Sequence, residues 1–194
     1  MSQDFFSARQ FRTLAALCDT LIPALPRAAD PYGFWARAAS DLGIPAEIAA
    51  ITRDLTDEIA QRDTRRLLNL LSNPLAAGLL TGQFRPFVDL PLERRERILR
   101  GWADSPAGLL RQAFQGLKRA TGALFFSKPA DDGRNPNWPA IGYPGPPGPG
   151  PTRPKTIPLL RPQAGQKLDC DVVVAGSGAG GAWPRPSWRK PAET

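Results

Sequence analysis

Six residues near the C-terminus have the types and spacing of a phosphate-binding turn: Gly176, Ser177, Gly178, Ala179, Gly180 and Gly181. They follow the apolar, β-branched run 171–175, and a buried strand that leads into G-x-G-x-x-G is typical of the start of a dinucleotide-binding domain. Gly176 would allow the tight turn, Gly178 the close approach to a diphosphate, and Gly181 the packing of helix on strand. All six are candidate cofactor-binding residues.

A phosphate turn of this kind needs a helix directly behind it, because the N-terminal amides of that helix face the phosphates. The next residues contain Pro184 and Pro186 and have no apolar periodicity, which excludes a regular helix. Trp is encoded by one codon only, TGG. If the gene is read two bases later from the codon of Trp183 onward, the following codons permit an alanine-rich helix. We therefore expect residues 182–194 to be an out-of-frame, disordered tail and the nucleotide-binding domain to be incomplete.

Few other residues suit catalysis or metal binding. The chain has no His, so it lacks the commonest general base and the commonest metal ligand. Cys18 and Cys170 lie far apart without metal-ligand spacing, which predicts two reduced, buried thiols in a cytoplasmic protein. The sequence therefore predicts no metal site, and no catalytic residue can be named.

The formal net charge of +7 raises the question of a nucleic-acid partner. Basic residues occur in scattered pairs, such as Arg65-Arg66 and Arg94-Arg95, next to acids or on polar helix faces. This distribution favours a solvated surface over nucleic-acid binding. No apolar run reaches the roughly 18 residues of a membrane span, and the first residues lack the basic start of a signal peptide, so neither is expected.

Residues 1–127 have the apolar periodicity of an all-α bundle, with no strand alternation and no internal repeat. We expect helices from the cap Ser7 to Pro23, from Asp30-Pro31 to Gly43, from Pro45 to Ile59, over 64–71, 75–80 and 92–102, and from the cap Ser105 to Leu124. The last of these is expected to pack on the core along its apolar face.

Residues 128–167 are rich in proline and glycine, which is typical of an extended connector. The segment 135–143 is too aromatic for a spacer, so we expect it to pack on a part of the full protein outside this chain. The expected fold class is mainly α: a helical domain over 1–127, a linker over 128–167, one β-strand and the glycine turn of an incomplete Rossmann-like domain over 168–181, and the tail 182–194.

Several stretches resemble a known family. The segment 11–23, ending in Leu17-Cys18-Asp19-Thr20-Leu21-Ile22-Pro23, resembles the helical N-terminal region of long-chain alcohol oxidases. These enzymes belong to the glucose-methanol-choline (GMC) group of FAD-dependent oxidoreductases. Segments 135–147 and 171–181 are similar to the stretch that leads this family into its FAD domain. The opening helix also resembles, more weakly, the small helical subunit of gluconate 2-dehydrogenase.

The resemblance implies oxidation of a primary, long-chain alcohol by hydride transfer to FAD N5, with a base taking the hydroxyl proton. The six residues from Gly176 to Gly181 would line the FAD diphosphate. The family's catalytic His and ribose-binding acid have no counterpart here, so we expect this chain to be inactive and to retain no FAD. We expect a cytoplasmic location, and peripheral contact with a membrane remains an alternative.

Two other functions remain open from the sequence. The first alternative is a helical accessory subunit, like the small dehydrogenase subunit, that docks on a flavoprotein partner. A basic nucleic-acid binder ranks third.

Overall fold

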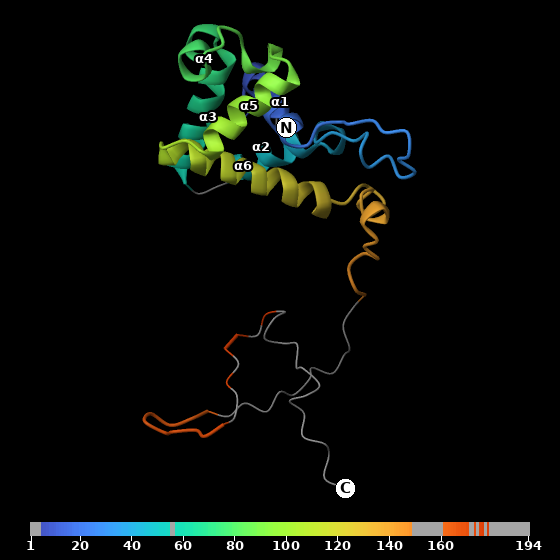
Figure 1. The fold of residues 1–194 in the computed structure, drawn as a ribbon, viewed down its shortest axis with the longest axis vertical. Coiled ribbons are helices and arrows are strands. Elements are labelled where there is room, and N and C mark those ends of the chain that lie inside the picture. The colour runs from blue at the N-terminus through green and yellow to red at the C-terminus, as the bar shows by residue number, and fades with distance from the viewer. Residues whose placement is uncertain are drawn as a thin grey trace. The chain divides into compact units, whose positions relative to one another are not determined.

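The computed structural model describes residues 5–54, 57–148, 161–170, 173, 175, 176 and 178. It divides into two units, residues 1–148 and 149–194, and the first unit is helical (Figure 1). Its α-helices are α1 (Ala8–Leu21), α2 (Ile44–Asp54), α3 (Glu58–Ser72), α4 (Pro74–Thr81), α5 (Leu92–Ala103) and α6 (Gly108–Ser127). Short 3₁₀ turns are η1 (Ser40–Leu42), η2 (Phe87–Asp89) and η3 (Pro139–Ile141). The prediction of a mainly α fold is confirmed.

Helix α1 is the centre of the helical unit, since it packs against α2, α3, α5 and α6. It begins as predicted at the cap Ser7, whose hydroxyl accepts the Gln10 amide while the Gln10 side chain accepts the Ser7 amide. Its buried face carries Leu14, Leu17 and Cys18, which lie in the hydrophobic core. The reciprocal cap fixes the start of α1, and burial on several sides supplies most of its stability.

Helix α6 is the longest of the described helices and contacts α1, α2 and α5 (Figure 1). Its apolar face contributes Phe125 to the core, with Leu117 and Leu124 half-buried beside it. The predicted core-packed helix is therefore confirmed. Its start differs, because the Ser105 hydroxyl accepts the Ala107 amide in a preceding turn and the helix begins at Gly108.

The predicted helix from Asp30 to Gly43 is wrong. The Asp30 carboxylate accepts three successive amides, but from Phe34, Trp35 and Ala36, four to six residues on, and not from the two amides that a helix cap binds. The chain then turns away, because Gly33 has a positive φ of 61° and the Leu25 amide bonds the Trp35 carbonyl. Only the short turn η1 follows. The predicted continuation of the next helix to Ile59 is also wrong, since α2 ends at Asp54 and Asp57 caps α3.

The segment after α6 packs on the carboxyl end of that helix (Figure 1). Asn135 and Asn137 are buried, and both side-chain amides donate to the Phe125 carbonyl, at 3.0 Å and 2.7 Å. The indole of Trp138 donates to the Phe126 carbonyl at 2.8 Å. The expectation that this segment packs on a part of the protein outside the chain is therefore wrong. It closes the exposed carbonyls at the end of α6.

In the second unit, the described residues 161–170, 173, 175, 176 and 178 include no strand. Val173 of the predicted strand is 79% exposed. Asp171, Val172 and Val174 of that strand and the tail 182–194 lie outside the described residues. Across the part of the chain that the structure describes, no helix has the length and apolar character that crossing a bilayer requires.

Candidate functional site

Only two residues of the predicted phosphate turn, Gly176 and Gly178, are described, and both are exposed. Ser177, Ala179, Gly180 and Gly181 lie outside the described residues. Gly176 has a φ of 107°, a conformation that L-residues rarely adopt, so a glycine is required there.

The two described glycines of this turn have open space beside them. A Cβ added to Gly176 or Gly178 would meet no heavy atom within 4 Å. Val173, which should be buried in a sheet, is exposed. Among the described residues, Gly176 thus has a turn conformation in exposed surroundings.

The two cysteines have opposite environments. Cys18 is buried as predicted, and burial raises the pKa of its thiol to about 12, partly offset by the Thr121 hydroxyl, which donates to Sγ at 3.8 Å. Cys170 is exposed, so the prediction of burial is wrong for that residue. Because Cys18 stays protonated at neutral pH, it is an inert core residue and not a nucleophile. Within the described residues, no three Cys, Asp or Glu side chains are grouped as a metal site would require.

A cavity of about 420 Å³ lies between α1, α2, α3 and α6, bordered by Trp102 of α5. We call it the apolar cavity, and its lining is mainly aliphatic: Leu14, Leu17, Ile48, Ile51, Thr52, Ala60, Thr64, Leu67, Trp102, Gln112, Ala113, Gly116, Leu117 and Ala120. Sequence reasoning missed it because apolar periodicity on α6 predicts a packed face. The available signal was the small residues Ala113, Gly116 and Ala120, whose three- and four-residue spacing leaves room beside the helix.

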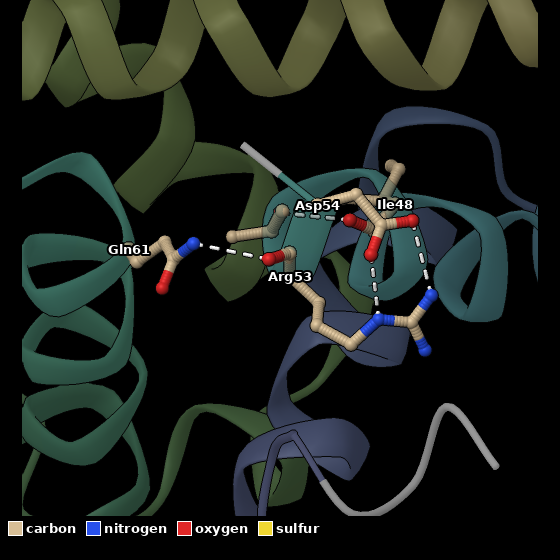
Figure 2. A network of polar contacts seen from close by, with 5 residues as sticks. Ile48, Arg53, Asp54 and Gln61 are labelled. Atoms are coloured by element: carbon tan, nitrogen blue, oxygen red, sulfur yellow. Dashed lines mark hydrogen bonds and ion pairs between the residues drawn. The ribbon is translucent and has the colours of Figure 1, made fainter. Parts of the chain in front are cut away.

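Polar contacts join α2 to α3 close to this cavity (Figure 2). The Gln61 side chain of α3 donates to the Arg53 carbonyl at the end of α2, at 3.0 Å. The Arg53 guanidinium donates twice to the Asp54 carboxylate, at 2.7 Å and 3.0 Å, and this hydrogen bonding lowers the pKa of Asp54. The contact between Gln61 and Arg53 therefore links the end of α2 to α3, two helices whose side chains line the cavity.

The described residues thus define an all-α module that offers a buried core and an apolar cavity. The comparisons with known proteins place this module in a family. The family model described as gluconate 2-dehydrogenase subunit 3 matches residues 8–145, and the chain belongs to that family.

The chain is also similar to plant long-chain-alcohol oxidases. It is 32% identical to the long-chain-alcohol oxidase FAO4A of Arabidopsis thaliana over 149 residues, which cover 69% of this chain and 20% of that protein. For FAO4B of the same plant the identity is 30% over 151 residues, covering 71% of this chain and 20% of the relative. The chain therefore spans about a fifth of the length of the curated relatives it matches. No solved structure matches it.

Proposed function

We propose that the helical unit is the docking module of a flavin-dependent oxidoreductase that acts on long-chain primary alcohols. The observation that supports this most directly is that the family match over residues 8–145 has nearly the bounds of the compact unit 1–148. Proteins named long-chain-alcohol oxidases share about 30% identity with most of this chain. One folded unit thus has relatives both in a dehydrogenase subunit and in alcohol oxidases.

In the first form of the proposal the flavin domain belongs to the same polypeptide, as in the GMC group. The domain order would be the helical unit 1–148, a linker, and the opening strand and turn of an FAD domain over 168–181. Gly176 to Gly181 would then approach the FAD diphosphate once neighbouring strands cover Val173. FAD would supply the oxidising chemistry, and the helical unit would contribute a docking surface.

In the second form the chain is a separate accessory subunit that docks on a flavoprotein partner. The description of the matching family as a dehydrogenase subunit favours this form. The closed end of α6 suits it as well, because Asn135, Asn137 and Trp138 satisfy that helix end within the chain. A unit with its own core and closed helix ends has what it needs to fold before it meets a partner.

Expression of the gene locus with an affinity tag at Met1 tests both forms. If the flavin domain is fused, the purified product is one long, yellow polypeptide whose flavin is bleached anaerobically by 1-dodecanol. If it is separate, the tag retains a second, yellow polypeptide that is bleached in the same way. A colourless product with no flavoprotein attached would contradict the proposal.

A further inference from the structure

We propose that the apolar cavity binds a single unbranched aliphatic chain. All residues that line the cavity belong to the helical unit, and none belongs to the predicted glycine turn. Its assignment depends only on the volume, lining and opening of the space between the helices.

The volume suits a ligand. At about 420 Å³, the cavity is well above the roughly 150 Å³ of an engineered apolar cavity that stays dry and takes up benzene. It falls in the range of about 300 to 1,000 Å³ that is usual for small-molecule pockets. Protein cores close over empty space wherever they can, so a hollow of this size costs stability unless something fills it.

The lining rejects polar ligands. The two hydroxyls that border the cavity already donate within their own helices: Thr52 to the Ile48 carbonyl at 2.7 Å and Thr64 to the Ala60 carbonyl at 2.8 Å. Leu14 and Leu17 of α1 form a fully apolar, buried floor. A polar group moved onto this floor would lose its bonds to water without replacement, whereas methylene groups lose none.

The cavity has a buried end and an open end. Leu14, Leu17 and Trp102 are buried, while Gln112 and Gly116 of α6 are exposed and Ile51 of α2 is 47% exposed. A ligand can therefore place hydrocarbon on the floor and keep a polar head group in water at the rim. One chain with one polar end has this shape.

Two sources could supply such a chain: a free primary alcohol or the acyl chain of a lipid. The alcohol is the natural source if the proposed function holds, and that part of the inference rests on it. Binding of the aliphatic chain itself does not, because it needs neither flavin nor partner.

Calorimetric titration of the full chain with 1-hexanol, 1-octanol, 1-decanol and 1-dodecanol tests the site. Each added methylene should tighten binding about three- to fourfold until the cavity is full. The probe 1,12-dodecanediol should bind about tenfold more weakly than 1-dodecanol, since one of its hydroxyls would have to be buried. Affinities that do not depend on chain length, or a diol that binds as well as the alcohol, would overturn the proposal.

Two glycines of α6 provide a matched pair of variants. A Cβ at Gly116 or at Gly122 meets no heavy atom within 4 Å, so either position accepts a larger side chain, but only Gly116 lines the cavity. Gly116→Leu should weaken 1-dodecanol binding at least tenfold, while Gly122→Leu should leave it unchanged. Leucine is the better helix former, so both variants should keep the fold, which circular dichroism checks. Equal affinities in the two variants would refute the assignment.

Further measurements identify the source and separate this inference from the proposed function. Sedimentation of the chain with phosphatidylcholine vesicles, reversed by 1-dodecanol, would assign the acyl chain of a lipid. Binding of the free alcohol without sedimentation would assign the alcohol. If 1-dodecanol binds but the tagged chain carries no flavoprotein, the proposed function fails and the cavity assignment stands; if a flavoprotein is retained but no alcohol binds, the reverse holds.

Discussion

Two non-helical stretches of the chain, residues 135–138 and residues 173–178, look equally specific in sequence and differ completely in the structure. In the first, Trp138 is only 8% exposed and the two asparagines beside it are buried. In the second, Val173 is 79% exposed, and Gly176 and Gly178 are exposed as well. Both stretches carry a recognisable motif, so the motif alone does not decide whether its residues are buried.

The difference lies in where each motif finds its partners. Asn135, Asn137 and Trp138 donate to the carbonyls of Phe125 and Phe126, which α6 leaves open at its end. Val173 needs neighbouring strands to cover it, and the described residues provide none. A motif that completes an element of its own chain is ordered by that chain, whereas a motif that opens a sheet depends on the rest of the sheet.

The largest effect is expected from Trp138→Ala, which removes a buried aromatic ring, its edge contact with Tyr143 and its bond to Phe126. We expect a loss of about 3 to 5 kcal/mol in the free energy of unfolding, measured by urea denaturation. Trp35→Ala is the matched control, since that ring is 40% exposed, and it should cost less than half as much. Equal losses would show that residues 135–138 are no more integral than the loop that carries Trp35.

A smaller effect is expected from Asn137→Ala. The substitution removes a buried donor to the Phe125 carbonyl and the acceptor of a part-buried bond from the Arg37 guanidinium. The unfolding free energy should fall by about 1 to 3 kcal/mol. Asp131→Ala, an exposed change a few residues earlier, should cost less than about 0.5 kcal/mol in the same assay. If the two variants unfold alike, the side-chain amide does not close the helix end.

The sequence predicts those parts of the fold whose signals are local. The cap at Ser7 and the bond from Gln10 lie within one turn, and α1 follows from them. The failed helix after Asp30 had an equally good local signal in the sequence, an Asp followed by Pro31. It was overruled by long-range bonds, from the Ala39 amide to the Ile22 carbonyl and from the Lys128 ammonium to the Leu42 carbonyl. No local pattern contains information of that kind.

The candidate site was harder to predict than the fold. The apolar period of α6 is the same whether its face meets another helix or an empty space, so the cavity depends on how the helices cross. The glycine turn differs, because its pattern is plain in the sequence. Of its six residues the structure describes only Gly176 and Gly178, and both are exposed.

The pH dependence of stability provides a third test, which compares the buried thiol of Cys18 with the exposed thiol of Cys170. Burial raises the pKa of Cys18 to about 12 from an ordinary value near 9. Between these values the unfolded chain loses the proton and the folded chain keeps it. Stability should therefore fall as pH rises through this window, by up to about 1.4 kcal/mol per pH unit from this group.

Urea denaturation at intervals across the window between these two pKa values measures this slope. Cys18→Ala should have a shallower decline than the unchanged chain, whatever its stability at neutral pH. Cys170→Ala should retain the full slope, because an exposed thiol titrates alike in both states. A slope that follows Cys170 would mean that the burial of the two thiols is reversed.

The smallest effect is expected from Val173→Ser, at the exposed end of the comparison. A side chain that is 79% exposed contributes little burial, so the unfolding free energy should change by less than about 0.5 kcal/mol. The unchanged chain should not bind FAD, and therefore should not quench FAD fluorescence in a titration, because the described residues around Gly176 are exposed. Saturable quenching that Val173→Ser abolishes would mean that Val173 and the turn beside it contact FAD without further strands. In that case a bound ligand covers Val173, and the contrast with residues 135–138 fails.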